Sequence, residues 1–298
     1  MRSISLFALL ALVTAGPSLA CAKHVRRGQK APTNGVKTLD VDFSAYNGEG
    51  LSTFLDKHSL YVSNYPVDST PISHTFVPSN VDIVDGALRL KVTGQSGKGD
   101  VKSAEVGTYA SNIRYGTFMT IAKLTPVPGV CFGAFTYTDD NHEIDIEALS
   151  SYYTTGYRES VPPGLEFTNQ PLIAGQQETN TAVPYGFDPT ADFHNYTIVW
   201  NAKSSQFYVD GKLRKTFTKN VPQIGASFIW NAWSSGVSLT PTGALARPSR
   251  TLTRSSRACI SSTRPSEPRQ ADSSFSPPSL HSRSHATPDV LRDTARCD

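Results

Sequence analysis

The sequence predicts an all-β fold of short antiparallel strands, and three observations predict it. Apolar residues make up 38% of the 298 residues and charged residues 18%, whereas 21 Gly, 20 Pro, 12 Tyr and 14 Phe indicate a loop-rich β protein. The apolar residues of the body follow a period of two in short runs. No window of helical length carries a 3.6-residue stripe. This pattern excludes a helical bundle, a coiled coil and a multi-pass membrane protein.

The first 22 residues predict a secretory signal peptide. Arg2 precedes an unbroken apolar run from Leu6 to Val13, and an Ala-x-Ala-like sequence ends at Ala22. The run is too short for a membrane span, which needs about 20 apolar residues. We therefore expect a secreted, extracellular protein that is free of the membrane after signal cleavage, with residues 23–35 as a linker.

Residues 36–236 are predicted to form one domain, since about 200 residues fit a single core. Residues 81–92 read as a hairpin around the turn Asp85-Gly86, and residues 206–213 carry a second turn of this kind at Asp210-Gly211. Further strands are expected over 116–121, 130–138, 196–200 and 227–233. Short strands divided by turns indicate a sandwich, a barrel or a jelly roll of antiparallel sheets.

Residues 237–298 are predicted to be a disordered tail rich in Ser, Pro and Arg. From residue 241 on there are 12 Ser, 7 Pro, 9 Arg and one aromatic residue, and no apolar periodicity. Such a segment buries too little surface to offset the entropy of ordering it.

Charge and motifs restrict the partners and cofactors. The net charge is +3, but residues 1–240 hold 19 basic and 20 acidic side chains, so the predicted domain has no basic stripe for nucleic acid. The sequence lacks zinc-binding Cys/His spacing, nucleotide-binding glycine motifs and the H-E-x-x-H and G-x-S-x-G motifs. We expect no cofactor, no metal, a monomer and a neutral partner.

The segment Glu143-Ile144-Asp145-Ile146-Glu147 carries the candidate chemistry. Strict alternation predicts a strand with the three carboxylates on one face and the two Ile on the other. The Cα atoms of Glu143 and Glu147 would be about 13 Å apart on a straight strand. On a concave sheet their carboxyl groups could approach the ~5–5.5 Å used by retaining glycosidases. The alternative is an exposed acidic strand or a weak Ca²⁺ site.

This segment resembles the E-x-D-x-E signature of the family-16 glycoside hydrolases, the group of lichenases, laminarinases and wall-remodelling transglycosylases. Residues 114–118, 132–137, 193–200, 207–211 and 229–233 are similar to other strands of that family, in the same order along residues 40–236. The resemblance implies a curved β-jelly roll sandwich of two antiparallel sheets (concanavalin A-like), with a glucan cleft on its concave face.

The resemblance also implies site residues. Glu143 would be the nucleophile, Asp145 its assisting carboxylate and Glu147 the general acid/base of a retaining endo-acting enzyme that cleaves β-1,3(4)-glucan. We predict that Tyr115, Asn231 and Trp233 bind the sugar, and we assign Trp200 and Phe207 to the core.

One departure from the family affects the fold. Its members continue past the Asn-x-Trp segment into another alternating strand, whereas this sequence turns into the Ser/Pro/Arg segment, so the sheet is expected to lack a neighbour there.

Two other functions stay open. A cell-wall glucan transglycosylase would use the same catalytic residues as a hydrolase and differ only in acceptor access. A non-catalytic, lectin-like carbohydrate-binding protein could share the fold. The presence of all three acids argues against the lectin, because a binding site needs no nucleophile opposite an acid.

Overall fold

The computed structural model describes residues 36–69, 72–93, 99–154, 164–234 and 251–263, the last segment as backbone only. All described residues belong to one compact unit, Asn34–Asp298. The predicted signal peptide and linker lie outside the described residues, as do positions 235–250 and 264–298. Over the described ranges, no helix has the length and apolar character to cross a membrane.

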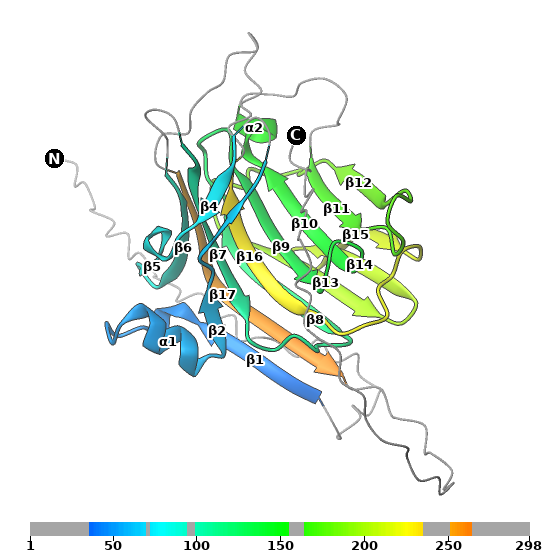
Figure 1. Ribbon diagram of the computed structural model, residues 1–298, viewed down its shortest axis with the longest axis horizontal. Coiled ribbons are helices and arrows are strands. Elements are labelled where there is room, and N and C mark those ends of the chain that lie inside the picture. Colours follow the sequence, from blue (N-terminus) through cyan, green and yellow to red (C-terminus); the bar gives the residue numbers. More distant parts are fainter. Residues whose placement is uncertain (1–35, 70–71, 94–98, 155–163, 235–250, 264–298) are drawn as a thin grey trace, which may run out of the picture. The chain divides into compact units, whose positions relative to one another are not determined.

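One sheet has the strand order β15-β14-β13-β8-β17-β6-β5, with β1 paired to β17, and all its pairs are antiparallel (Figure 1). Its strands are β1 (Val36–Asp42), β5 (Val81–Val84), β6 (Ala87–Val92), β8 (Gly116–Lys123), β13 (His194–Asn201), β14 (Ser204–Val209), β15 (Lys212–Phe217) and β17 (Thr251–Thr263).

The second sheet has the order β12-β11-β10-β9-β16-β7-β4-β3, with β2 paired to β7. Its strands are β2 (Leu60–Val62), β3 (Tyr65–Val67), β4 (His74–Phe76), β7 (Val101–Thr108), β9 (Cys131–Tyr137), β10 (Glu143–Leu149), β11 (Leu165–Asn169), β12 (Thr179–Val183) and β16 (Ser227–Trp233). Only β4 and β7 pair in parallel among its described strands. Two short helices, α1 (Leu51–Lys57) and α2 (Ser150–Thr154), complete the described elements of regular structure apart from two 3₁₀ turns.

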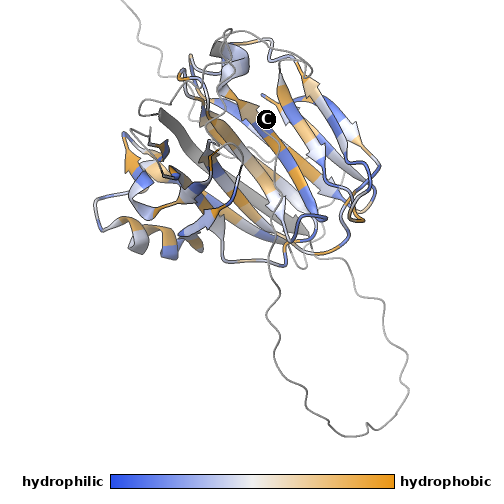
Figure 2. Cartoon of the chain, turned by 45° about the horizontal axis from the view of Figure 1, so that its top comes forward, coloured by the Kyte–Doolittle hydropathy of each residue, from blue (hydrophilic) through white to orange (hydrophobic). Residues whose placement is uncertain are grey.

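The all-β prediction is confirmed, and so are the two predicted hairpins. Asp85-Gly86 joins β5 to β6 and Asp210-Gly211 joins β14 to β15, with positive φ angles at all four turn residues. Positive φ at both central positions is what a tight turn between twisted antiparallel strands requires, and Asp-Gly supplies it at low cost. Figure 2 shows the underlying pattern, hydrophilic and hydrophobic residues alternating along the strands.

The core lies between the two sheets. Phe118 of β8 stacks on Phe228 of β16 with ring centroids 4.9 Å apart, and Phe167 of β11 stacks on Phe207 of β14 at 4.7 Å. Each pair joins one sheet to the other, and Trp200 is buried in the same cluster. The assignment of Trp200 and Phe207 to the core is confirmed.

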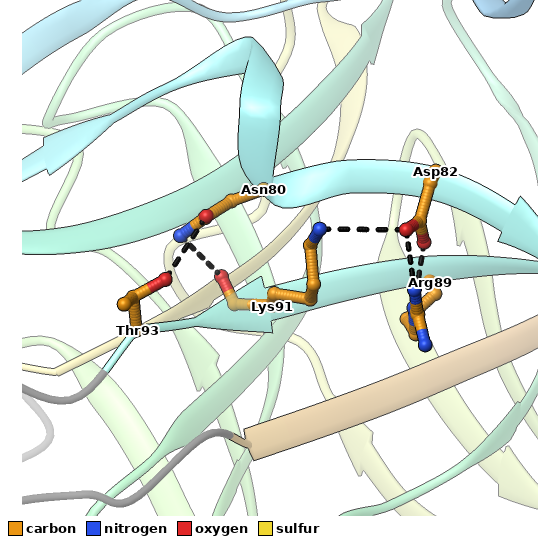
Figure 3. Close-up of polar contacts among 5 residues, drawn as sticks. All are labelled: Asn80, Asp82, Arg89, Lys91 and Thr93. Carbon is orange, nitrogen blue, oxygen red and sulfur yellow. Dashed lines mark hydrogen bonds and ion pairs between the residues drawn. The ribbon is translucent and has the colours of Figure 1, made fainter.

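Polar contacts among five side chains and one carbonyl hold the β5–β6 hairpin together (Figure 3). Asp82 on β5 accepts hydrogen bonds from the Arg89 guanidinium and, at 3.3 Å, from Lys91 Nζ. At the other end, Asn80 donates to the Lys91 carbonyl and accepts from Thr93 Oγ1. These bonds support the antiparallel register between β5 and β6, and β6 in turn pairs with β17.

The structure differs from the predicted disordered tail over Thr251–Thr263, which form β17. This strand pairs with β8 on one side and with β6 and β1 on the other. It therefore occupies the place of the neighbour that the sheet was expected to lack. The sequence of Thr251–Thr263 has no alternating apolar pattern that would predict a strand. Backbone hydrogen bonds to strands on both sides can order a segment without such a pattern.

Candidate active site

The three predicted acids lie on β10, inside the nine-stranded sheet between β9 and β11. Ile144 and Ile146 are fully buried in the core between the sheets, whereas Glu143, Asp145 and Glu147 line a cavity on the opposite face. The period of two therefore separates core from cavity, as the sequence predicts. Asp145 is buried, and the two Glu flanking it are partly exposed.

The cavity has a volume of about 500 Å³ and is open to solvent. Besides the three acids, its lining includes Tyr61, Val62, Ser63, Asn64, Tyr65, Val67, His74, Phe76, Glu105, Phe135, Tyr137, Asp140, Gln170, Ile229, Asn231 and Trp233. These residues come from β2, β3, β4, β7, β9, β10, β16 and adjoining loops, so the cavity runs across the strands. Apolar rings beside carboxylates and amides are the surface that a sugar needs, since its rings have apolar faces and polar edges.

The strand register aligns polar groups across this face. Glu147, Gly133, Asn231 and Glu105 are successive cross-strand partners on β10, β9, β16 and β7. A Cβ on Gly133 would lie 2.6 Å from Asn231 Oδ1, so this amide occupies the space above the glycine. The missing side chain thus lets the Asn231 amide lie directly over β9.

Burial and mutual contact separate the protonation states of Glu143 and Asp145. Burial raises the pKa of Glu143 to about 8, and a hydrogen bond with Asp145 opposes that rise. Burial and the adjacent Glu143 charge raise the pKa of Asp145 well above its usual range. The hydrogen bond between them lowers the pKa of Glu143 and raises that of Asp145, so Asp145 is the donor and Glu143 is the first of the pair to ionise as the pH rises.

Gln170 fixes this pair from the next strand. Its Nε2 donates to Asp145 Oδ2 at 3.3 Å, and its backbone N–H donates to the Glu143 carbonyl at 3.1 Å. An amide that donates to one Asp145 oxygen leaves the other oxygen for the contact with Glu143. No motif marks the end of β11, so the sequence alone does not predict a role for Gln170.

A buried carboxylate, Glu105, was also missed. It accepts hydrogen bonds from Ser63 Oγ at 2.6 Å and Tyr65 Oη at 2.9 Å, and all three residues line the cavity. In the sequence Glu105 is a single acid within Val101–Thr108, and no motif surrounds it. Ser63 directly follows β2 and Tyr65 begins β3, some 40 residues before Glu105, so only the tertiary structure brings the three together.

The structure brings two of the three predicted sugar-binding residues to the cavity. Asn231 and Trp233 line it, and within the described part of the chain Asn231 Oδ1 is buried without a hydrogen-bond partner. Trp233 stacks on His74 with ring centroids 5.0 Å apart. Burial lowers the pKa of His74 to about 4, so the ring beside the indole is neutral at neutral pH.

Tyr115 does not line the cavity, so its predicted role as a sugar-binding residue is not supported by its position. Its ring packs edge-on against Trp200 at 5.1 Å, and its hydroxyl donates to Gln223 Oε1 at 2.8 Å. It precedes β8 of the other sheet. Its family-like neighbours in sequence mark the entry to a strand rather than the cleft.

Glu147 lies at the end of β10 near Cys131. Cys131 is disulfide-bonded, and its Sγ lies 3.6 Å from Glu147 Oε1. Leu149 and Trp233 are the cross-strand partners of Cys131 on either side. Among the described residues, no group of three or more His, Cys, Asp or Glu is arranged to hold a metal ion.

Sequence comparison relates the chain to known proteins. Residues 69–249, more than half of the chain, match the sequence model of the family described as Glycosyl hydrolases family 16. A β-glucanase of Paenibacillus polymyxa is 28% identical over 220 residues, which cover 67% of this chain and 82% of that protein. A β-glucanase of Bacillus licheniformis is 30% identical over 176 residues, 54% of this chain and 63% of that protein. The chain thus spans less than two thirds of this second relative.

Solved structures give the same fold. The Bacillus licheniformis β-glucanase superimposes with a TM-score of 0.57 at 21% identity, over 78% of this chain and 100% of that one. The laminarinase catalytic domain from Thermotoga maritima superimposes with a TM-score of 0.54 at 16% identity, over 76% and 97% of the two chains. These neighbours and the strand order confirm the jelly-roll sandwich of two antiparallel sheets.

Proposed function

The chain belongs to glycosyl hydrolase family 16, and from this premise we propose that it is a secreted, retaining endo-β-1,3(4)-glucanase. The observation that carries the proposal is the arrangement of Glu143, Asp145 and Glu147 along one strand in one cavity with Asn231 and Trp233. Matches to β-glucanases support β-glucan as the substrate. The sequence of residues 1–22 supports secretion.

In the first step Glu147 gives its proton to the glycosidic oxygen while the Glu143 carboxylate attacks the anomeric carbon. The bond from that carbon to the leaving oxygen breaks, the leaving portion departs as an alcohol, and a glycosyl ester forms on Glu143. Asp145, protonated and hydrogen-bonded to Glu143, stabilises the negative charge of the nucleophile before attack and after release.

In the second step Glu147 acts as the base. Its carboxylate takes a proton from a water molecule, whose oxygen attacks the same anomeric carbon and releases Glu143. Two displacements restore the original β configuration.

The test measures new reducing ends on mixed-linkage β-glucan and on β-1,3-glucan, with a labelled acceptor oligosaccharide present. We expect reducing ends from the wild-type protein and a loss of roughly 10⁴-fold or more in kcat for Glu143→Gln. Tyr208→Ala, a tyrosine on the other sheet, is the control and should keep full activity. Label incorporation without new reducing ends would identify a transglycosylase, and binding without product a lectin.

A further inference from the structure

A second row of cross-strand partners leads from the catalytic strand to the far end of the cavity. It runs from Asp145 on β10 to Phe135 on β9, Ile229 on β16, Gly107 on β7 and Tyr61 on β2. All of these except the glycine contribute to the cavity lining. Four strand spacings separate the ends of the row, about 19 Å in backbone distance.

The glycine in this row makes room for the tyrosine at its end. A Cβ on Gly107 would lie 2.7 Å from both Cζ and Oη of Tyr61, closer than any carbon side chain permits. The Tyr61 ring therefore lies against the bare backbone of β7. Any other residue at position 107 would displace this ring, so Gly107 and Tyr61 act as one unit.

A second aromatic ring extends this surface. Tyr109, two residues after Gly107, lies with its ring centroid 5.6 Å from that of Tyr61 and is 60% exposed. Its hydroxyl donates to Asp56 at 2.9 Å, and its backbone N–H donates to the Ser59 carbonyl. The first bond ties the ring to α1 and the second ties its backbone to the α1–β2 connection, so the ring is held in place while much of its surface stays in water.

We propose that Tyr61, supported by Tyr109, is a distal sugar-binding platform that takes a pyranose ring of the β-glucan chain several units away from the bond that is cleaved. The inference rests on the proposed function. Phe135 and Ile229 give the chain an apolar floor between the two ends, and the tyrosine ring offers a flat apolar face with a polar edge, the surface that sugar rings bind. Because the platform lies far from the acids, only long oligosaccharides reach it.

The test compares kcat/KM for short and long β-glucan oligosaccharides. Tyr61→Ala should lower kcat/KM about tenfold for the long substrates and leave the short ones unchanged, a loss of the size expected for one aromatic stacking contact. Tyr109→Ala should give a smaller loss of the same kind, about threefold. Tyr61→Phe keeps the ring and should stay within about twofold of wild type, as should the control Tyr208→Ala.

Gly107→Ala tests the same idea without removing an aromatic ring. The added methyl group should displace Tyr61 and reproduce the loss that is selective for long substrates. The ratio of long to short kcat/KM does not depend on the fraction of correctly folded enzyme, so a folding defect cannot imitate the result. An equal loss on short and long substrates for Tyr61→Ala, or no loss on either, would overturn the platform.

The platform and the proposed function fail in different ways. If the wild-type protein cleaves no β-glucan, the proposed function is wrong, and calorimetric titration with the long oligosaccharide then decides the platform. Weaker binding by Tyr61→Ala than by Tyr208→Ala supports it, and equal or absent binding by both overturns it.

Discussion

The nine-stranded sheet presents two faces that are built from the same strands and have opposite composition. On β10 the core face carries Ile144 and Ile146, and the cavity face carries Glu143, Asp145 and Glu147. On β16 the core face carries Phe228, Trp230 and Ala232, against Ile229, Asn231 and Trp233 on the other. The core face supplies most of the apolar burial, while the cavity face holds buried charges that oppose folding.

This difference teaches how one strand can serve both needs. Core packing fixes the backbone of β10, and the backbone in turn fixes where the acids point. Substitutions on the core face should therefore change stability first, whereas substitutions on the cavity face should change activity and leave stability equal or higher.

The largest expected effect distinguishes the roles of Glu143 and Glu147 on the cavity face. Glu143→Ala should lower kcat by roughly 10⁴-fold or more, and Glu147→Ala should lower it by about 10²–10⁴-fold. Added azide should restore turnover with an activated β-glucoside in both, but with opposite stereochemistry. In Glu143→Ala azide replaces the nucleophile in a single displacement, so the product is the α-azide.

In Glu147→Ala the glycosyl ester on Glu143 still forms, and azide replaces water in the second displacement, so the product is the β-azide. Proton NMR of the anomeric position distinguishes the two products. The same anomer from both variants would refute the assigned roles, because the two acids would then not act in separate steps.

The next effect belongs to the core face. Ile146→Ala removes three carbons from a residue that is 1% exposed, and we expect a loss of about 2–5 kcal/mol in the free energy of unfolding. At temperatures below the unfolding transition, kcat per folded molecule should change much less in Ile146→Ala than in Glu143→Ala or Glu147→Ala. Urea unfolding followed by fluorescence measures the free energy of unfolding. Active-site titration with a mechanism-based inhibitor gives the concentration of folded enzyme, by which kcat is corrected. Leu213→Ala, an exposed position on β15, is the control and should be neutral.

The period of two was sufficient to predict this division of β10 and the hairpins around Asp85-Gly86 and Asp210-Gly211. These features are local, because each depends on neighbours in the sequence. The resemblance to a family then gave the acids their predicted roles. The strands β8, β9, β13 and β16 follow from the same alternation.

The features that the sequence did not predict depend on contacts between segments that are distant in the chain. The sequence of Thr251–Thr263 shows no alternating apolar pattern, and the place of β17 in the sheet follows from backbone pairing with β8, β6 and β1. Glu105 meets Ser63 only because β2 pairs with β7. Tyr115 belongs to a family-like segment yet packs on Trp200, because the motif reports its position in the chain and not the direction of its side chain.

The smallest effect tests the cost of the charges on the cavity face. Because burial raises the pKa of Glu143 to about 8, the folded protein binds this proton more tightly than the unfolded chain does. The corresponding stability is fully present below the ordinary pKa, near 4.5, and is lost as the pH rises toward 8. Glu143→Gln carries a neutral amide at every pH and escapes this loss.

The melting temperature of Glu143→Gln should therefore match that of the wild type near pH 4 and exceed it by a few degrees near pH 8, since about 1 kcal/mol corresponds to roughly 2–4 °C for a domain of this size. Asp192→Asn, at an exposed acid, should give no such divergence. A difference that stays constant with pH would mean that Glu143 is no less stable as an anion in the cavity than in water. The cavity face would then cost the fold nothing, and the contrast with the core face would rest on packing alone.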